Sequence, residues 1–164
     1  MKIFDTSSVV CIFSEIKYPK IFEICKEYGY QLCITPQVYD EITQNPETFQ
    51  HLKGYGDINI VNTVDGDCYT KLSKRYPWMH KGEISVLCAG LSKKGSHERY
   101  YCIIDERARK LRDKLHVRVT GTVGLILWQK SLSALTKGEC QDLYNKFLQS
   151  EFWIKKDIIQ GLLK

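Results

Sequence analysis

The chain has 164 residues, which is enough for one domain that buries roughly two-thirds of its unfolded surface. No apolar run approaches the roughly 20 residues of a membrane-spanning helix, and an acid at position 5 comes too early for a signal peptide, so we expect a cytoplasmic protein. The formal net charge of +5 does not establish nucleic-acid binding, but it permits a basic surface beside an acidic site.

The cysteines and histidines are scattered along the chain. No two cysteines form a Cys-x-x-Cys pair, and the four histidines show no metal-ligand spacing. We therefore predict reduced, mostly buried thiols and neither a disulfide framework nor a structural zinc site. The seven cysteines are Cys11, Cys25, Cys33, Cys68, Cys88, Cys102 and Cys140.

The first 34 residues predict a strand, a helix and a second strand. Residues 2–4 form a short strand that ends at Asp5. Asp5 is either a functional acid at a strand end or a helix cap. A helix is expected over residues 19–28 with Gly29 as its stop, and residues 32–34 form the second strand.

A Thr-Pro pair at 35–36 predicts the start of a helix that reaches Thr43. Glu41 flanks its apolar stripe, where it serves either a site or only the surface. Asn45-Pro46 ends this helix, and the stretch to Gly56 is loop-rich with room for one short helix.

A third strand is expected over residues 58–64, followed by a helix over residues 68–76. His80 to Glu83 opens the next helix, and Glu83 borders its buried face. An acid in a first helical turn is also favoured by the helix dipole, so Glu83 has a structural explanation too. The small residues Ser85, Ala89 and Gly90 indicate close packing against a neighbour.

Residues 100–122 predict a strand–helix–strand unit of the parallel, right-handed type. A strand over 100–104 stops at Asp105 and Glu106, a helix with a basic face covers about 107–114, and a strand over 116–119 follows. An apolar helix over 123–128 and two C-terminal helices separated by residues 151–154 complete the chain. The basic residues of 107–114 and of the loop 93–99 form either a nucleic-acid surface or a solvated face.

Four carboxylates are expected to meet at one edge of the sheet. Asp5 and Asp105 end parallel strands, Glu41 lies early in the helix after the second strand, and Glu83 begins the helix that leads to the Asp105 strand. Such carboxylates repel one another unless a positive charge lies between them. Their oxygens are the ligands that Mg²⁺ or Mn²⁺ prefers.

The ordered set of these residues resembles the PIN domain. It is especially similar to the prokaryotic branch of predicted nucleic-acid-binding proteins related to VapC-type toxin ribonucleases, and the tail at 152–154 is similar as well. No single motif is specific, but the order is. The matching segments are Asp5-Thr6-Ser7, Glu41, Gly82-Glu83-Ile84-Ser85, Ile104-Asp105-Glu106-Arg107-Ala108-Arg109 and Thr120-Gly121-Thr122-Val123-Gly124.

The resemblance implies one PIN-like domain over residues 1–164, with a three-layer α/β/α (Rossmann-like) fold and a central parallel sheet of about five strands. It implies an acidic pocket for Mg²⁺ or Mn²⁺ and an endoribonuclease that hydrolyses RNA phosphodiesters. Asp5, Glu41, Glu83 and Asp105 match the catalytic and metal-binding positions. Two assignments stay open: whether Asp105 or Glu106 is the ligand at the end of its strand, and whether Asp40 or Glu41 is the ligand in its helix.

In the chemistry that this implies, the metal activates the attacking water. Asp5 and Asp105 would be ligands, and Glu41 and Glu83 would be ligands or would orient that water. The hydroxyls of Ser7, Thr120 and Thr122 would hold a carboxylate or contact phosphate, or else only cap helices. A water nucleophile needs no 2′-hydroxyl, so the mechanism alone does not exclude DNA.

Partners follow from the same resemblance: single-stranded or structured RNA, an antitoxin protein, and a second copy of the chain. The contact between two copies is expected at the apolar residues Phe147, Phe152, Trp153 and Ile154. Neither a Gly-x-Gly-x-x-Gly motif after the first strand nor a P-loop is present. The alternative function is a non-catalytic PIN fold that binds RNA or a partner.

Overall fold

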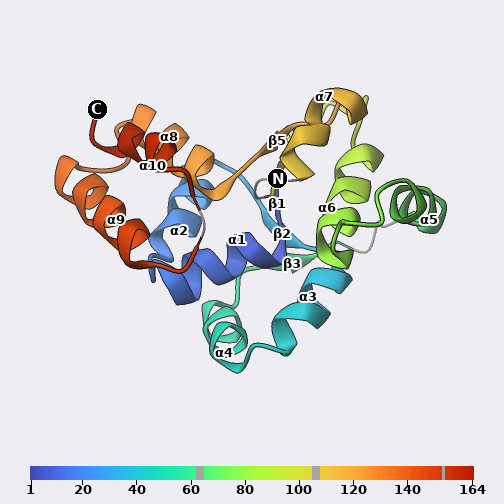
Figure 1. The fold of residues 1–164 in the computed structure, drawn as a ribbon, viewed down its shortest axis with the longest axis horizontal. Helices are drawn as coiled ribbons and strands as arrows, with labels where there is room; N and C mark the ends of the chain where they lie inside the picture. Colours follow the sequence, from blue (N-terminus) through green and yellow to red (C-terminus); the bar gives the residue numbers. More distant parts are fainter. Residues whose placement is uncertain (62–64, 105–107, 153) are drawn as a thin grey trace.

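The computed structural model describes residues 1–61, 65–104, 108–152 and 154–164, and it has a five-stranded parallel sheet at its centre. Helices cover both faces of the sheet: α2 and α8 lie on one side, and α6 lies on the other (Figure 1). The predicted three-layer α/β/α fold is confirmed. The strands, in spatial order, are β3 (Asn59–Ile60), β2 (Leu32–Ile34), β1 (Lys2–Phe4), β4 (Tyr101–Ile103) and β5 (Val119–Thr120).

The helices follow the strands in the manner of a parallel sheet, in which each crossover packs on a face. Their bounds are α1 (Thr6–Val10), which continues as a π-helix (Cys11–Glu15), α2 (Lys20–Glu27), α3 (Pro36–Thr43), α4 (Pro46–Tyr55), α5 (Gly66–Arg75), α6 (Lys81–Ser92), α7 (Arg112–Leu115) after a 3₁₀ turn (Ala108–Leu111), α8 (Thr122–Ser131), α9 (Lys137–Gln149) and α10 (Lys156–Ile159) before a 3₁₀ turn (Gln160–Leu162).

The central strands are covered on both faces, and their residues are apolar except for Lys2 of β1. All three residues of β1 and of β2 are buried, whereas both residues of the edge strand β3 are exposed. Gly90 of α6 packs against the sheet: a Cβ there would lie 2.5 Å from Cys102 Sγ and 2.9 Å from Val117 Cγ1. The close packing predicted from the small residues of this helix is therefore confirmed.

The stretch from Asn45 to Gly56, predicted to be loop-rich with room for one short helix, is instead helical over most of its length. Asn45 caps α4, a helix of ten residues, and its side-chain oxygen accepts the backbone N–H of Thr48 at 3.1 Å. Pro46 occupies the first helical position, where its missing N–H costs nothing. The Asn-Pro pair thus ends one helix and begins the next.

The second strand of the central unit lies later than predicted. His116 has a φ of +53° and ends α7 in the left-handed conformation, so the chain turns there and pairs only at β5. The strand predicted over 58–64 is reduced to Asn59 and Ile60 among the described residues, and residues 62–64 lie outside them.

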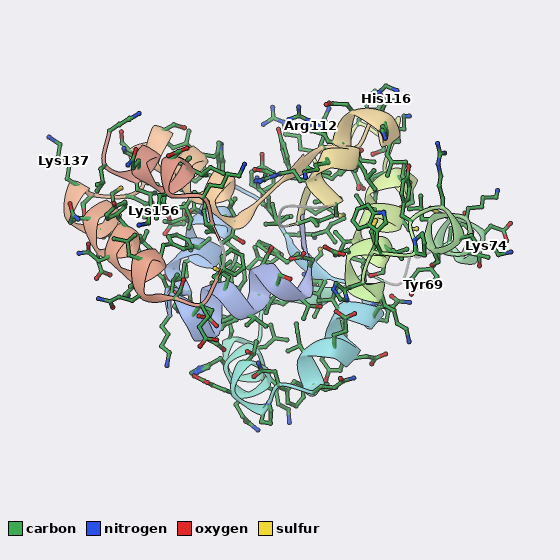
Figure 2. The ribbon with its side chains drawn as sticks, viewed as in Figure 1. Tyr69, Lys74, Arg112, His116, Lys137 and Lys156 are labelled. Atoms are coloured by element: carbon green, nitrogen blue, oxygen red, sulfur yellow. The ribbon has the colours of Figure 1, made fainter. Side chains whose placement is uncertain are left out.

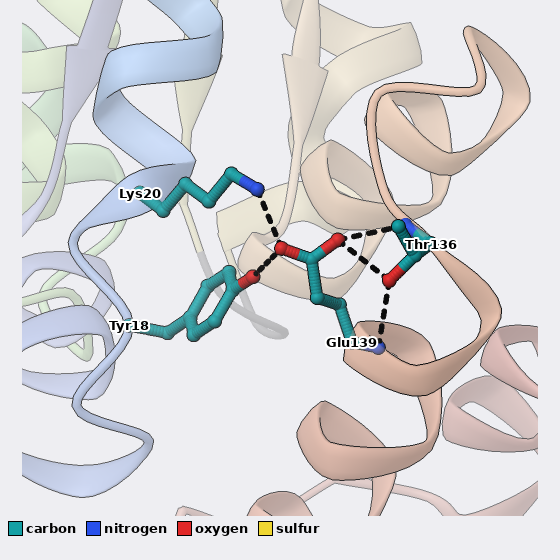
Figure 3. Close-up of polar contacts among 4 residues, drawn as sticks. All are labelled: Tyr18, Lys20, Thr136 and Glu139. Carbon is teal, nitrogen blue, oxygen red and sulfur yellow. Dashed lines mark hydrogen bonds and ion pairs between the residues drawn. The ribbon is translucent and has the colours of Figure 1, made fainter.

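The side chain of Glu139 links α9 to Tyr18 and Lys20 at the start of α2 (Figure 3). One carboxylate oxygen accepts the hydroxyl of Tyr18 at 2.7 Å and the ammonium of Lys20. The other accepts the backbone N–H of Thr136 at 2.8 Å and its hydroxyl at 2.9 Å. Glu139 therefore combines a capping box with a tertiary link.

Three of the four apolar residues behind the homodimer prediction, Phe147, Phe152 and Ile154, lie in the core or pack against it. Phe147 is 4% exposed, and Phe152 and Ile154 are partly buried against the core. Trp153 lies outside the described residues. Dimerisation stays a prediction.

All seven cysteines are free thiols, and six of them are buried. The Sγ atoms of Cys68 on α5 and Cys88 on α6 are 2.8 Å apart. Over the described ranges, every helix is too short or too polar to cross a bilayer.

Candidate functional site

A cavity of about 220 Å³ lies at the edge of the sheet where β1 ends. Its lining comes from three elements: the start of α1, the second half of α3 and the start of α6, so Glu41 lies later in its helix than the sequence predicted. The lining residues are Asp5, Thr6, Ser7, Glu41, His80 and Glu83. Three of the four carboxylates expected at one site thus line one cavity, and the fourth, Asp105, lies outside the described residues together with Glu106.

Asp5 follows the last residue of β1 and is 1% exposed. Its Oδ1 accepts the backbone N–H of Ser8 at 2.8 Å, so it caps α1. Its own N–H donates to Ile103 O of β4 at 3.0 Å, which fixes the residue against the neighbouring strand. The two explanations of Asp5 are therefore compatible, because a capping carboxylate also borders the cavity.

Glu41 is held from two sides. Its Oε1 accepts the backbone N–H of Gly82 at 2.9 Å, and its Oε2 accepts the hydroxyl of Thr6. Asp40 is exposed and does not line the cavity, so the geometry favours Glu41 between these two acids.

Glu83 is the third residue of α6, and its Oε2 accepts the backbone N–H of His80 at 2.9 Å. This bond is half of a capping box, so Glu83 stabilises the start of α6. The same side chain lines the cavity. His80 lies beside it and was not expected here, because the histidines show no spacing; its position just before the Lys-Gly-Glu turn is the only signal.

The negative charges of the site affect neighbouring groups. Burial, and after it the charge of Asp5, raises the pKa of Cys102 on β4 to about 12. Burial and then the charge of Glu41 raise the pKa of Tyr69 on α5, which Figure 2 labels beside α6. Both shifts have the sign expected near carboxylates.

A family model described as a PIN domain matches residues 1–164. The chain belongs to the PIN-domain family. No curated protein matches it, and no solved structure does. PIN domains are generally nucleases that act on nucleic acids, and they generally use divalent metal ions.

The donor set of this PIN domain suits such an ion in kind, because its acids and hydroxyls offer the oxygen atoms that hard divalent cations prefer. In the described part of the chain, however, no three His, Cys, Asp or Glu residues come together as a group that could hold a metal. Each of the three carboxylates accepts a hydrogen bond from the protein. Asp5 accepts the N–H of Ser8, Glu41 accepts the N–H of Gly82 and the hydroxyl of Thr6, and Glu83 accepts the N–H of His80.

The hydroxyl residues expected around the PIN site divide into two groups. Ser7 is exposed and lines the cavity. Thr120 ends β5 and Thr122 is fully buried at the start of α8, and neither belongs to the cavity lining. The hydroxyl of Thr6, which was not among the hydroxyl candidates from the sequence, donates to Glu41 Oε2.

The basic helix lies apart from this cavity. Arg112 begins α7 and His116 follows its last residue, and this helix lies at the far side of the molecule from α3 (Figures 1 and 2). Lys110, Arg112 and Lys114 are exposed. Among the described residues, neither Lys nor Arg lines the acidic cavity.

Proposed function

We propose that residues 1–164 act as a single PIN domain and as a metal-dependent endoribonuclease that hydrolyses RNA phosphodiester bonds. The observation that carries this proposal is the cavity at the end of β1, to which three separate elements contribute Asp5, Glu41 and Glu83. Membership of a family of nucleases supports the same reaction class. In a parallel α/β sheet, this edge is where ligands bind.

We assign the metal-binding oxygens to Asp5, Glu41, Glu83 and Asp105. When bound, Mg²⁺ or Mn²⁺ supplies Lewis-acid polarisation of the phosphate and a more acidic attacking water. The chain's own groups hold and orient these carboxylates, through Ser8 N–H for Asp5 and through Thr6 and Gly82 for Glu41. Ser7, Thr120 and Thr122 remain candidates for contacts to a carboxylate or to phosphate.

The biological setting of the proposal follows from the resemblance to VapC-type toxins. We propose single-stranded or structured RNA as substrate, in the cytoplasm, with an antitoxin protein and a second copy of the chain as partners. A small gene that overlaps this one and encodes a protein that inhibits cleavage would support the toxin role.

The test is cleavage of a synthetic RNA in Mn²⁺ by the protein and by Glu41→Gln, with Glu47→Gln as the matched control. Glu47 is an exposed glutamate of α4, and its Oε1 lies 3.3 Å from the ammonium of Lys17 and 4.0 Å from Nε2 of His51. We expect Glu41→Gln to lose at least ~100-fold in rate, on the scale of a catalytic group, while Glu47→Gln keeps it. Products should carry 5′-phosphates, and 2′,3′-cyclic phosphate ends would refute a water nucleophile.

One observation favours the alternative, a PIN fold that binds RNA or a partner without cutting. The three described carboxylates are each bonded within the protein, and they form no metal-holding group among the described residues. If RNA binds equally in chelator and in Mn²⁺ and is never cut, the binding function is correct and the nuclease proposal fails.

A further inference from the structure

Both carboxylate oxygens of Glu41 are hydrogen-bonded to described residues. The backbone N–H of Gly82 on α6 donates to Oε1 at 2.9 Å, and the hydroxyl of Thr6 on α1 donates to Oε2. Each carboxylate oxygen has two acceptor positions, so each keeps one after this contact. The side chain is thereby fixed in direction without losing its capacity to bind another group.

The helix turn that supplies the N–H is itself fixed. Ser85 donates its hydroxyl to Gly82 O at 2.7 Å and lies 2.5 Å from the hydroxyl of Thr35, the cap of α3. Thr35 and Ser85 are both fully buried. The start of α6 is therefore joined to α3 twice, once through Glu41 and once through this pair of hydroxyls.

Position 82 has no room for a side chain. A Cβ on Gly82 would lie 2.5 Å from Glu41 Oε2 and 2.9 Å from Thr6 Oγ1, and both contacts are far inside van der Waals distance. Either Glu41 or Thr6 would have to move to admit a methyl group. A methyl group at position 82 would therefore displace the contact between Glu41 and Thr6.

The chain contains a natural comparison for Gly82. Helix α9 begins with the same three residues, Lys-Gly-Glu, and Gly138 occupies the position in α9 that Gly82 occupies in α6. A Cβ on Gly138 would meet nothing closer than Thr136 Oγ1 at 4.0 Å. The same local sequence thus tolerates a methyl group at one helix start and excludes it at the other.

We propose that Thr6 and Gly82 are positioning residues that hold Glu41 in the geometry needed to bind the divalent cation. This inference rests on the proposed function, because it assumes that Glu41 is a ligand. The two fixed donors hold the Glu41 carboxylate in one orientation, and they thereby aim its remaining lone pairs. Removing such a partner of a metal ligand typically weakens metal binding or activity by about 10- to 100-fold.

The experiment measures Mn²⁺ binding to the full chain by electron paramagnetic resonance of the free ion, alongside RNA cleavage. Thr6→Val removes the hydroxyl at nearly constant volume, and Gly82→Ala adds the excluded methyl group. We expect both to weaken Mn²⁺ binding about 10- to 100-fold. Thr6→Ser, which keeps the hydroxyl, should retain most of the affinity, and Gly138→Ala should bind as the unchanged protein does.

The outcomes separate the inference from the proposed function. If Glu41→Gln abolishes Mn²⁺ binding while Thr6→Val and Gly82→Ala leave it intact, the positioning role is wrong and the nuclease proposal stands. If Glu41→Gln does not change Mn²⁺ binding, the assignment of the ligand fails, and the inference fails with it. Thermal melts of both variants in chelator show whether each one folds. If Gly82→Ala does not fold, Thr6→Val still tests the positioning role.

Discussion

The hydroxyl of Tyr18 donates to the Oε1 of Glu139 at 2.7 Å across a separation of 121 residues. This bond joins the segment before α2 to the first turn of α9, and Lys20 reinforces it at the same oxygen. The hydrogen bond from Lys20, followed by those from Thr136 and Tyr18, lowers the pKa of Glu139 to about 2. The link between α9 and the start of α2 therefore depends on Glu139 being ionised.

The first prediction follows from this lowered pKa. Because the folded-state pKa lies below the ordinary value of 4.5, the unfolded chain takes up this proton first as the pH falls. The contribution of Glu139 is present above about pH 4.5 and is lost as the pH falls towards about 2. Urea unfolding over this range should show the unfolding free energies of the protein and of Glu139→Gln converging.

Asp142→Asn is the matched control, since Asp142 also lies on α9 and pairs with Lys146 at 3.0 Å on the surface. Exposed pairs of this type contribute little, on the order of 0–1 kcal/mol. Curves for Glu139→Gln and for the protein that stay parallel from pH 7 to pH 2 would contradict the prediction.

The second prediction separates the two roles of Asp5. Asparagine caps a helix about as well as aspartate but carries no charge, whereas alanine supplies neither a cap nor a charge. In chelator we expect Asp5→Asn to match or exceed the stability of the protein, because it relieves repulsion with the other acids. Asp5→Ala should be less stable than Asp5→Asn by about 1 kcal/mol, the typical cost of a lost cap.

Mn²⁺ distinguishes the roles further. A ligand that binds only the folded state should raise the melting temperature of the protein, and should raise that of Asp5→Asn much less. A variant that melts below the protein in chelator, with no Mn²⁺ shift in either, would leave Asp5 as a helix cap only.

The third prediction concerns Lys2, which is 3% exposed on β1. Its ammonium lies 4.1 Å from the ring centroid of Tyr30, 4.3 Å from Tyr101 and 4.2 Å from Trp128. Burial lowers the pKa of Lys2, and the charge of Cys25 opposes this only in part. The folded protein therefore releases this proton at a lower pH than the unfolded chain does.

Since the unfolded state then binds more protons, the contribution of Lys2 to stability should rise as the pH increases to about 10.5, the ordinary value for lysine. We expect the unfolding free energy of the protein, minus that of Lys2→Met, to increase between about pH 8 and about pH 10.5. Lys53→Met tests an exposed lysine for comparison, with its ammonium 5.7 Å from the Phe49 ring. A difference that falls with pH would show that the rings stabilise the charged form more than burial disfavours it.

The fourth prediction concerns Cys68 and Cys88, whose sulfur atoms are 2.8 Å apart on α5 and α6. Treatment with diamide should oxidise the two thiols to one disulfide, with two electrons and two protons passing to the diamide. Mass spectrometry should detect the loss of two hydrogen atoms and a cross-linked peptide pair. Cys68→Ser should abolish the product, and Cys140→Ser should not; a product that survives Cys68→Ser would assign it to another pair.

Local signals in the sequence were sufficient for most of the sheet and for part of the site. Strand runs such as Leu32–Ile34, and caps such as Thr35-Pro36, act within a few residues, so they can be read from the sequence directly. Glu41 and Glu83 were recognisable because each borders an apolar helix face. The roles of Asp5, Glu41, Glu83 and Asp105 stay predictions, and the position of Asp105 lies outside the described residues.

What the sequence could not supply depends on contacts between distant elements. Ser7 and Thr6 are neighbours, and only the packing of α1 against α3 shows that Thr6 is the one that contacts Glu41. The exclusion of a side chain at Gly82 likewise depends on two other helices. The spacing of the histidines in the sequence did not indicate His80. It reaches the cavity because it is the residue just before α6.

The central place of β1 in the sheet affects how the chain can fold during synthesis. Lys2 pairs with Leu32 on one side and with Tyr101 on the other. At about 5–20 residues per second, the ribosome finishes the second neighbour many seconds after the first strand. The edge of β1 that pairs with β4 therefore stays unpaired until β4 has been made, and such long-range parallel pairing is slow. Chaperone dependence during expression is the consequence we expect, and it should be greatest for chains truncated before β4.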